Sequence, residues 1–155
     1  MASVIIREAN RSDCSDIAAL IQELAAYEKL ENEAIATADT LEQSLFGPQP
    51  YAFALLAEAG GKLAGFCIYF HNFSTFLGKP GIYIEDIFVR EMYRGLGIGK
   101  LFFARISEIA KQKDCGRIEW WVLDWNQPAI DFYAKMGAEA MAEWTVYRLT
   151  QDKFK

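Results

Sequence analysis

Apolar and polar residues follow one another along this chain with two spacings, one typical of helices and one typical of strands. Where apolar residues recur every three or four positions, the pattern predicts helices over 12–29, 37–46, 100–113 and 128–136. Runs rich in β-branched and aromatic residues predict strands over 4–7, 51–58, 63–70, 82–89, 117–122 and 144–149. Residues 72–81 contain glycine and proline breakers, and they are predicted to form a loop.

Short polar residues and a glycine mark the ends of several helices. Ser12 or Asp13 can cap the first helix, and Thr37 can cap the second. Asn126 can cap the last helix, which Gly137 stops.

The order of the elements predicts one domain. The chain has 155 residues, of which 52% are hydrophobic, and this suits a single packed core. Two apolar runs on either side of the Gly-Gly turn at 59–62 indicate a hairpin. The arrangement predicts an α/β (α+β) fold over residues 1–155, in which helices flank a mixed, mostly antiparallel sheet.

Charge and cysteine content narrow the class of partner. Acids outnumber bases 21 to 16 and no basic cluster occurs, so a cationic substrate is a better expectation than a nucleic acid. The three cysteines lack the spacing of metal ligands, and no metal is expected. Neither a signal-peptide pattern nor an apolar run of membrane-spanning length occurs, so we expect a soluble, cytoplasmic protein with no membrane partner.

The most informative segment is a glycine-rich turn, Arg94-Gly95-Leu96-Gly97-Ile98-Gly99, between the strand over 82–89 and a helix. Glycines let backbone N–H groups approach a ligand, and a helix start adds unpaired donors, so the segment favours a phosphate or pyrophosphate. Its spacing is too short for a P-loop, and its G-x-G-x-G order does not match a dinucleotide fingerprint. A glycine-rich connection without a ligand stays open at this point.

The same turn resembles the pyrophosphate motif of the GNAT superfamily of N-acetyltransferases, which bind acetyl-CoA. The resemblance implies that backbone amides of the turn hold the pyrophosphate, and that the end of the preceding strand pairs with the pantetheine arm. Asn126 and its neighbours resemble the second cofactor contact of that family. The expected cofactor-binding residues are Ile87, Phe88, Val89, Arg94, Gly95, Leu96, Gly97, Ile98, Gly99, Lys100, Asn126, Gln127, Pro128, Ala129 and Tyr133.

Over nearly its whole length the chain is similar to one branch of that superfamily, the diamine (spermidine/spermine) acetyltransferases and their thialysine-acetylating relatives. Matching stretches include 23–30, 83–86 and 123–127. In the polyamine enzymes an acid in the loop before the strand of Glu85 contacts the distal amine, whereas here that loop reads Asn72-Phe73-Ser74-Thr75-Phe76. The chain therefore resembles the thialysine branch more closely. The resemblance also implies a homodimer.

Acetylation of an amine needs an unprotonated nitrogen, and an alkyl amine with a pKa of about 10.4 is almost fully protonated at neutral pH. A carboxylate can act as the base. Strand alternation places Glu85 and Asp86 on opposite faces, so that only one of them faces the amine directly. The resemblance implies that Glu85 is this base and that Tyr133, whose hydroxyl can donate a proton, is the acid for the leaving thiolate.

Candidate acceptor-binding residues combine acids with aromatic rings, which suits an alkylammonium ion. The expected set is Tyr27, Glu28, Glu85, Glu119, Trp120 and Trp121. Tyr27 and Glu28 match substrate positions of the family, and a carboxylate near a helix C-terminus is itself a mild misfit that hints at a role. For Glu28 a solvated surface acid is an equal alternative. The last three residues are candidates by position only, and tryptophans that fill the core are an equal alternative.

Together these features predict direct transfer of an acetyl group from acetyl-CoA to a primary amine of a small cationic substrate, either a thialysine-like amino acid or a short diamine. Two alternatives stay open. The chain could acetylate protein N-termini or lysines, or it could be an acyl-CoA-binding module without catalysis. The presence of both Glu85 and Tyr133 favours an enzyme.

Overall fold

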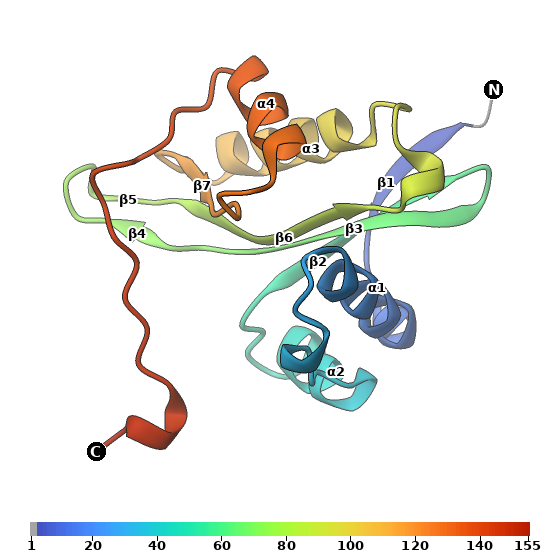
Figure 1. Cartoon of the computed structure of the whole chain (residues 1–155), viewed down its shortest axis with the longest axis horizontal. Helices are drawn as coiled ribbons and strands as arrows, with labels where there is room; N and C mark the ends of the chain where they lie inside the picture. The colour runs from blue at the N-terminus through green and yellow to red at the C-terminus, as the bar shows by residue number, and fades with distance from the viewer. Residues whose placement is uncertain (1–2) are drawn as a thin grey trace. The chain divides into compact units, whose positions relative to one another are not determined.

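The computed structural model describes residues 3–155, which divide into two compact units (Figure 1). The first unit runs to Trp121 and the second begins at Val122. The sheet, the glycine turn and the first three α-helices belong to the first unit, and the fourth α-helix belongs to the second. No helix among the described residues is long and apolar enough to span a membrane.

A five-stranded sheet with the order β1-β2-β3-β6-β7 forms the first unit. Its strands are β1 (Val4–Glu8), β2 (Phe53–Ala59), β3 (Lys62–Phe70), β6 (Ile82–Val89) and β7 (Ile118–Trp120). Neighbouring strands are antiparallel except for β7, which lies parallel to β6. The predicted mixed, mostly antiparallel sheet is therefore confirmed, as is the hairpin that joins β2 to β3.

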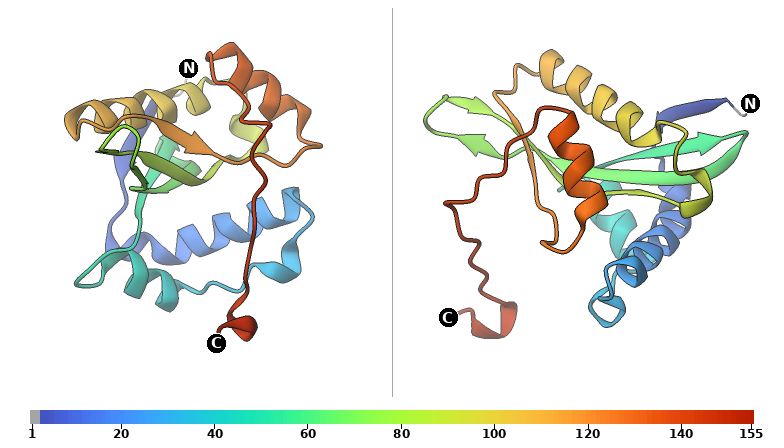
Figure 2. Two further views of the ribbon diagram at one scale, coloured as in Figure 1. Left: turned by 90° about the vertical axis from the view of Figure 1, so that its left-hand side faces the viewer. Right: turned by 45° about the horizontal axis from the view of Figure 1, so that its top comes forward.

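Helices cover both faces of this sheet (Figure 2). α1 (Cys14–Tyr27) and α2 (Ala38–Phe46) lie on one face, and α3 (Ile98–Gln112) lies on the other. Three 3-10 turns join these elements: η1 (Arg11–Asp13), η2 (Glu31–Glu33) and η3 (Glu91–Tyr93). The core under α1 and α2 is one buried cluster that includes Ile17, Leu20, Leu24, Leu41, Leu56, Phe66, Ile68 and Phe88. On the opposite face, α3 buries Ile98, Phe102 and Ile106.

The start of α1 differs from the prediction in the role of its polar residues. Asn10 caps η1 by accepting the backbone N–H of Ser12 at 3.1 Å. Asp13 stands at the N-cap position of α1, but its side chain makes no capping hydrogen bond there. Its carboxylate instead accepts two hydrogen bonds from Arg7, at 2.8 and 3.0 Å, and Arg7 holds the pKa of Asp13 below its usual range. Thr37 caps α2 as predicted.

Three segments of the first unit differ from the prediction in extent. The predicted loop over 72–81 contains the two-residue strands β4 (Phe73–Ser74) and β5 (Lys79–Pro80), which are too short to produce a period-two pattern. The strand predicted over 117–122 shortens to β7. The helix predicted over 100–113 begins at Ile98, because Gly97 takes the N-cap position with a left-handed φ of 80°.

The second unit contains α4 (Gln127–Lys135), an extended segment and the 3-10 turn η4 (Gln151–Lys153). Asn126 caps α4 as predicted, since its side chain accepts the N–H of Ala129. Gly137 follows the helix with a φ of 89°, a conformation that ends helices readily when the residue is glycine.

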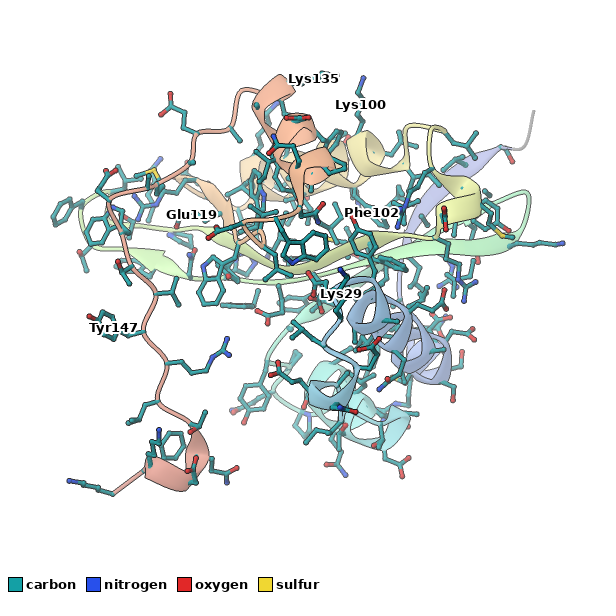
Figure 3. All side chains as sticks on the ribbon, in the orientation of Figure 1. Lys29, Lys100, Phe102, Glu119, Lys135 and Tyr147 are labelled. Carbon is teal, nitrogen blue, oxygen red and sulfur yellow. The ribbon has the colours of Figure 1, made fainter. Side chains whose placement is uncertain are left out.

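The prediction of a strand over 144–149 is wrong. These residues are extended, but no strand pairs with them anywhere in the described range 3–155. The side chains of Trp144, Val146, Tyr147 and Leu149 are exposed, and Figure 3 shows the Tyr147 ring directed away from the ribbon. β-Branched and aromatic residues favour an extended backbone, but a strand also needs a neighbour for its peptide groups.

Candidate active site

The glycine turn leads from β6 and η3 into the start of α3. Gly95 and Gly97 have φ values of 83° and 80°, in the left-handed region that glycine reaches without strain. Nothing lies within 4 Å of the place where a Cβ on either glycine would stand, so this side of the backbone is open. The first N–H groups of α3 have no acceptor inside the helix and carry the positive end of its dipole. The turn therefore fits a pyrophosphate.

Two cations of the turn point in different directions. Lys100, in the first turn of α3, directs its side chain away from the sheet (Figure 3). Arg94 donates from Nε to the carbonyl oxygen of Val89 at 3.0 Å, and its guanidinium carbon lies 5.0 Å from the centre of the Tyr27 ring. The structure thus brings together a predicted cofactor residue, Arg94, and a predicted substrate residue, Tyr27, in a cation–π contact.

The second half of β6 has an open edge. β7 pairs only with Ile82–Ile84, whereas β3 pairs along β6 as far as Val89. Among residues 3–121, no strand lies beside the other edge of β6 from Glu85 to Val89. Peptide groups on such an edge can hydrogen-bond an extended ligand. Ile87–Val89, for which pantetheine contacts are predicted, belong to this stretch.

A β-bulge at Glu85 changes the direction of side chains along β6. Asp86 pairs with Ile68 and Ile84 pairs with Tyr69, so Glu85 is left without a partner in β3. Paired residues share a face of the sheet, and Ile68 belongs to the core cluster under α1. Asp86 therefore lies on the α1 face and Ile84 on the opposite one. The predicted strict alternation is wrong here, because a bulge inserts one additional residue.

Two acids near this bulge, Asp86 and Glu28, are poorly solvated. Burial, together with the charges of Glu85 and Glu28, raises the pKa of Asp86 from 3.8 to about 7. Burial also raises the pKa of Glu28, the residue that follows α1. The pKa of Tyr83 is raised by burial and then by Glu85 and Asp86. Such a site attracts an alkylammonium ion, because a cation relieves the repulsion between the acids.

Three expected acceptor-binding residues lie in β7 or directly after it, and their side chains have different surroundings. Glu119 pairs with Tyr83 of β6, and Figure 3 labels its side chain. The ring of Trp121 meets that of Tyr83 edge-on, with centroids 5.8 Å apart. Trp120 packs instead against Phe103 of α3, with centroids 4.9 Å apart. Glu119 and Trp121 thus share the surroundings of Tyr83, while Trp120 is directed toward α3.

Arg90, which the sequence did not single out, ties the end of β6 to α1. It donates to the two carboxylate oxygens of Glu23 from Nε at 2.9 Å and from Nη2 at 2.8 Å, and to the carbonyl oxygen of Leu63 at 2.9 Å. Such bidentate, charge-assisted pairs are geometrically specific. The pair sets the position of α1, whose end carries Tyr27 and Glu28, against β6. No local pattern indicates it, because the two residues are 67 positions apart.

In the second unit, α4 carries the remaining predicted residues. Pro128 stands in its first turn, where its missing N–H is not needed. Gln127 donates from Nε2 to Asp131 at 2.7 Å, one turn further along. Tyr133 is half-buried, and its ring centre lies 5.8 Å from that of Phe132. The capped, proline-started helix gives Tyr133 a defined position on α4.

The family model described as acetyltransferase (GNAT) family matches residues 17–138. The matched region contains the glycine turn, β6 with its acids, and α4. The chain belongs to the GNAT family. The resemblance predicted from the turn is thereby confirmed, and so is the class of enzyme, an acyltransferase, because the matching family consists of acetyltransferases.

Curated GNAT relatives resemble this chain over most of its length. The thialysine N-epsilon-acetyltransferase of Sus scrofa is 38% identical, over 96% of this chain and 93% of the relative. The L-ornithine N5-acetyltransferase of Arabidopsis thaliana is 33% identical, over 95% of this chain and 84% of the relative. Among solved structures, an integron cassette protein from the mobile metagenome of V. cholerae superposes with a TM-score of 0.81 at 26% identity, over 97% of this chain and 94% of that chain.

Proposed function

We propose that this GNAT chain transfers an acetyl group directly from acetyl-CoA to a primary amine of a small cationic substrate, a thialysine-like amino acid or a short diamine. The proposal rests on the gathering of three acids beside the open half of β6, the strand that leads to the glycine turn: burial, and after it the charges of Glu85 and Glu28, raise the pKa of Asp86. The turn offers donors for an anionic cofactor, and the acids offer negative charge for a cationic acceptor. Two curated relatives, named as a thialysine acetyltransferase and an L-ornithine acetyltransferase, agree with it.

Acetyl-CoA, when bound, supplies the acyl thioester. We assign its pyrophosphate to the backbone N–H groups of residues 94–100 and its pantetheine arm to the open edge of β6 at Ile87–Val89. Since Lys100 points its side chain away from the sheet, its contribution is the backbone N–H. Residues 126–129 at the start of α4 and Tyr133 provide further cofactor contacts.

Glu85 and Tyr133 take complementary roles in this proposal. Glu85 accepts a proton from the acceptor ammonium, so that the neutral nitrogen can attack the thioester carbon. A C–N bond forms, the C–S bond breaks, and the hydroxyl of Tyr133 protonates the leaving thiolate. Tyr133 then recovers a proton from the acylated nitrogen by way of water. The nitrogen loses two protons in all, one of which ends on the thiol and the other in solvent.

The acceptor's other polar groups are assigned to the remaining acids and rings. Glu28 and Tyr27 at the end of α1 contact the amine end, where Asp86 adds negative charge. Glu119 and Trp121, which both lie beside Tyr83, offer an acid and a ring for the distal end of the substrate.

A panel of amines tests this function. Purified protein with acetyl-CoA is expected to release free thiol with L-thialysine, ornithine or short diamines, and to turn over lysine peptides at least tenfold more slowly. Glu28→Gln removes one charge from the acceptor site, and it is expected to raise KM for the amine by about tenfold, because a hydrogen bond to a charged group contributes about 1.5–3 kcal/mol. KM for acetyl-CoA is expected to stay unchanged.

Asp39→Asn, an exposed change on α2, is the matched control for the amine panel and is expected to behave as the unmodified chain. Faster turnover of peptides than of small amines would move the assignment to a protein acetyltransferase. Acetyl-CoA binding without thiol release from any amine would indicate a non-catalytic module.

We also propose that the chain forms a homodimer. The support is the extended segment over 144–149, whose exposed apolar residues lie on both faces: Trp144 and Val146 on one, Tyr147 and Leu149 on the other. An extended segment with these side chains gains stability from a neighbouring strand and from burial, and a second copy of the chain supplies both.

Sedimentation equilibrium tests the dimer. The unmodified chain is expected to sediment as a dimer, and Tyr147→Asp is expected to shift it toward monomer, since a carboxylate in an apolar contact is costly to desolvate. Tyr51→Asp, which alters another exposed tyrosine outside the segment, is expected to leave the dimer intact. A monomeric unmodified chain, or equal effects of the two substitutions, would contradict the proposal.

A further inference from the structure

Asp86 is a half-buried acid to which the reaction described above assigns only a contribution of negative charge. Asp86 lies on the α1 face of the sheet, because it pairs with Ile68 of β3 and stands two residues before Phe88, and both of these belong to the core cluster under α1. Glu85, one residue earlier, is exposed to solvent. The two carboxyls therefore differ in solvation, although they are neighbours in the sequence.

Titratable and charged groups around Asp86 come from three elements. They are Tyr83 and Glu85 of β6, Cys67 of β3, and Glu28 at the end of α1. Of these, Glu85 and Glu28 disfavour the charged form of Asp86, and burial disfavours it most. The resulting pKa of about 7 means that Asp86 exchanges a proton near neutral pH.

We propose that Asp86 is the residue that holds the proton removed from the acceptor amine, and that it receives this proton through Glu85. The inference rests on the proposed acetyl transfer. Asp86 acts through Glu85 and does not contact the substrate, whereas Glu85 remains the group that contacts the nitrogen.

The step conserves protons and charge. The ammonium gives one proton to the Glu85 carboxylate, which passes one to the Asp86 carboxylate, directly or through one water. The neutral amine attacks the thioester, forming the C–N bond as the C–S bond breaks; Tyr133 protonates the leaving thiolate and recovers the second proton of the nitrogen by way of water. Asp86 returns its proton to solvent after product leaves, so the cycle restores both carboxylates and needs no further reactant.

Poor solvation favours this transfer. An ammonium ion beside a buried carboxylate places two charges where water solvates them poorly, whereas a neutral amine beside a protonated Asp86 places none there. Solvent holds the charge of the exposed Glu85, so Glu85 has less to gain from keeping the proton. A proton acceptor is most effective when its pKa lies near the working pH, as that of Asp86 does at neutral pH.

The pH dependence of kcat/KM separates a proton-holding role from a structural one. With acetyl-CoA and L-thialysine, the unmodified chain is expected to lose activity below pH 7 along a limb set by Asp86. Asp86→Asn is expected to lower kcat/KM by about 10²-fold and to remove this limb, since proton transfer typically contributes about 10²–10⁴-fold. Glu85→Gln is expected to lower kcat/KM but to retain a protonated Asp86 near neutral pH. Asp39→Asn is expected to change neither rate nor limb.

Difference infrared spectroscopy of the full chain provides a readout that needs no turnover. A protonated-carboxyl band that disappears as pH rises through about 7 is expected in the unmodified chain and in Glu85→Gln, and is expected to be absent in Asp86→Asn. An unchanged acid limb or an unchanged band in Asp86→Asn would overturn the inference while leaving acetyl transfer standing. An unmodified chain that releases no thiol with any amine would instead remove the proposed function, and this inference with it.

Discussion

Tyr133→Phe is expected to lower kcat by about 10²–10⁴-fold, the usual contribution of one general acid. The substitution keeps the ring that lies 5.8 Å from Phe132 and removes only the hydroxyl, so α4 is expected to stay folded. A thiolate then leaves without a proton donor, which slows collapse of the tetrahedral intermediate. Steady-state kinetics with saturating amine and acetyl-CoA, read as release of free thiol, measure the change.

The effects of Tyr133→Phe on kcat and on KM distinguish a role in the chemical step from a role in binding. KM for acetyl-CoA is expected to change by less than about threefold, because an interaction made only in the transition state affects kcat and kcat/KM equally. Tyr51→Phe, at an exposed tyrosine of the first unit, serves as the control and is expected to retain full activity. If Tyr133→Phe kept the unmodified kcat, the acid would have to be another group.

Asp86→Asn is expected to stabilise the fold above neutral pH. The pKa of Asp86 is raised on folding, from 3.8 to about 7, so the folded chain binds its proton more tightly than the unfolded chain does. Stability therefore falls as pH rises from about 4 to about 7 and stays reduced above that. At about 1.4 kcal/mol for each pKa unit, the penalty reaches about 4 kcal/mol at pH 8. Urea unfolding at pH 5 and pH 8 measures this free energy, and the advantage of the variant is expected to grow with pH.

Asp13→Asn is the control of opposite sign for this stability prediction. Arg7 lowers the pKa of Asp13, so this acid contributes stability above its unfolded pKa, and the contribution is lost as pH falls through the folded one. Its replacement is expected to destabilise the chain at pH 8, where Asp86→Asn stabilises it. A gain from Asp86→Asn that did not depend on pH would show that packing, rather than ionisation, is responsible.

Local patterns in the sequence predicted much of the fold. The strand over 82–89 is observed as β6 with the predicted bounds, and Thr37 and Asn126 cap α2 and α4 as their side chains predict. These features depend on residues within one turn of one another. The segment over 144–149 shows the limit of this reasoning, since its β-branched and aromatic side chains predicted a strand, but residues 3–155 contain no partner strand for it.

The amino-acid sequence by itself determined the glycine turn, its place between strand and helix, and the family to which the chain belongs, because these features are contiguous and their physical effect is local. Which of the two adjacent acids, Glu85 or Asp86, is the less solvated depends on the tertiary structure. The pairing of Asp86 with Ile68 of β3 places Asp86 on the face that α1 covers, while Glu85, at the bulge, has no partner in β3. Two adjacent carboxyls with similar intrinsic chemistry thus acquire different solvation, because the free energy of a charge depends on what packs around it.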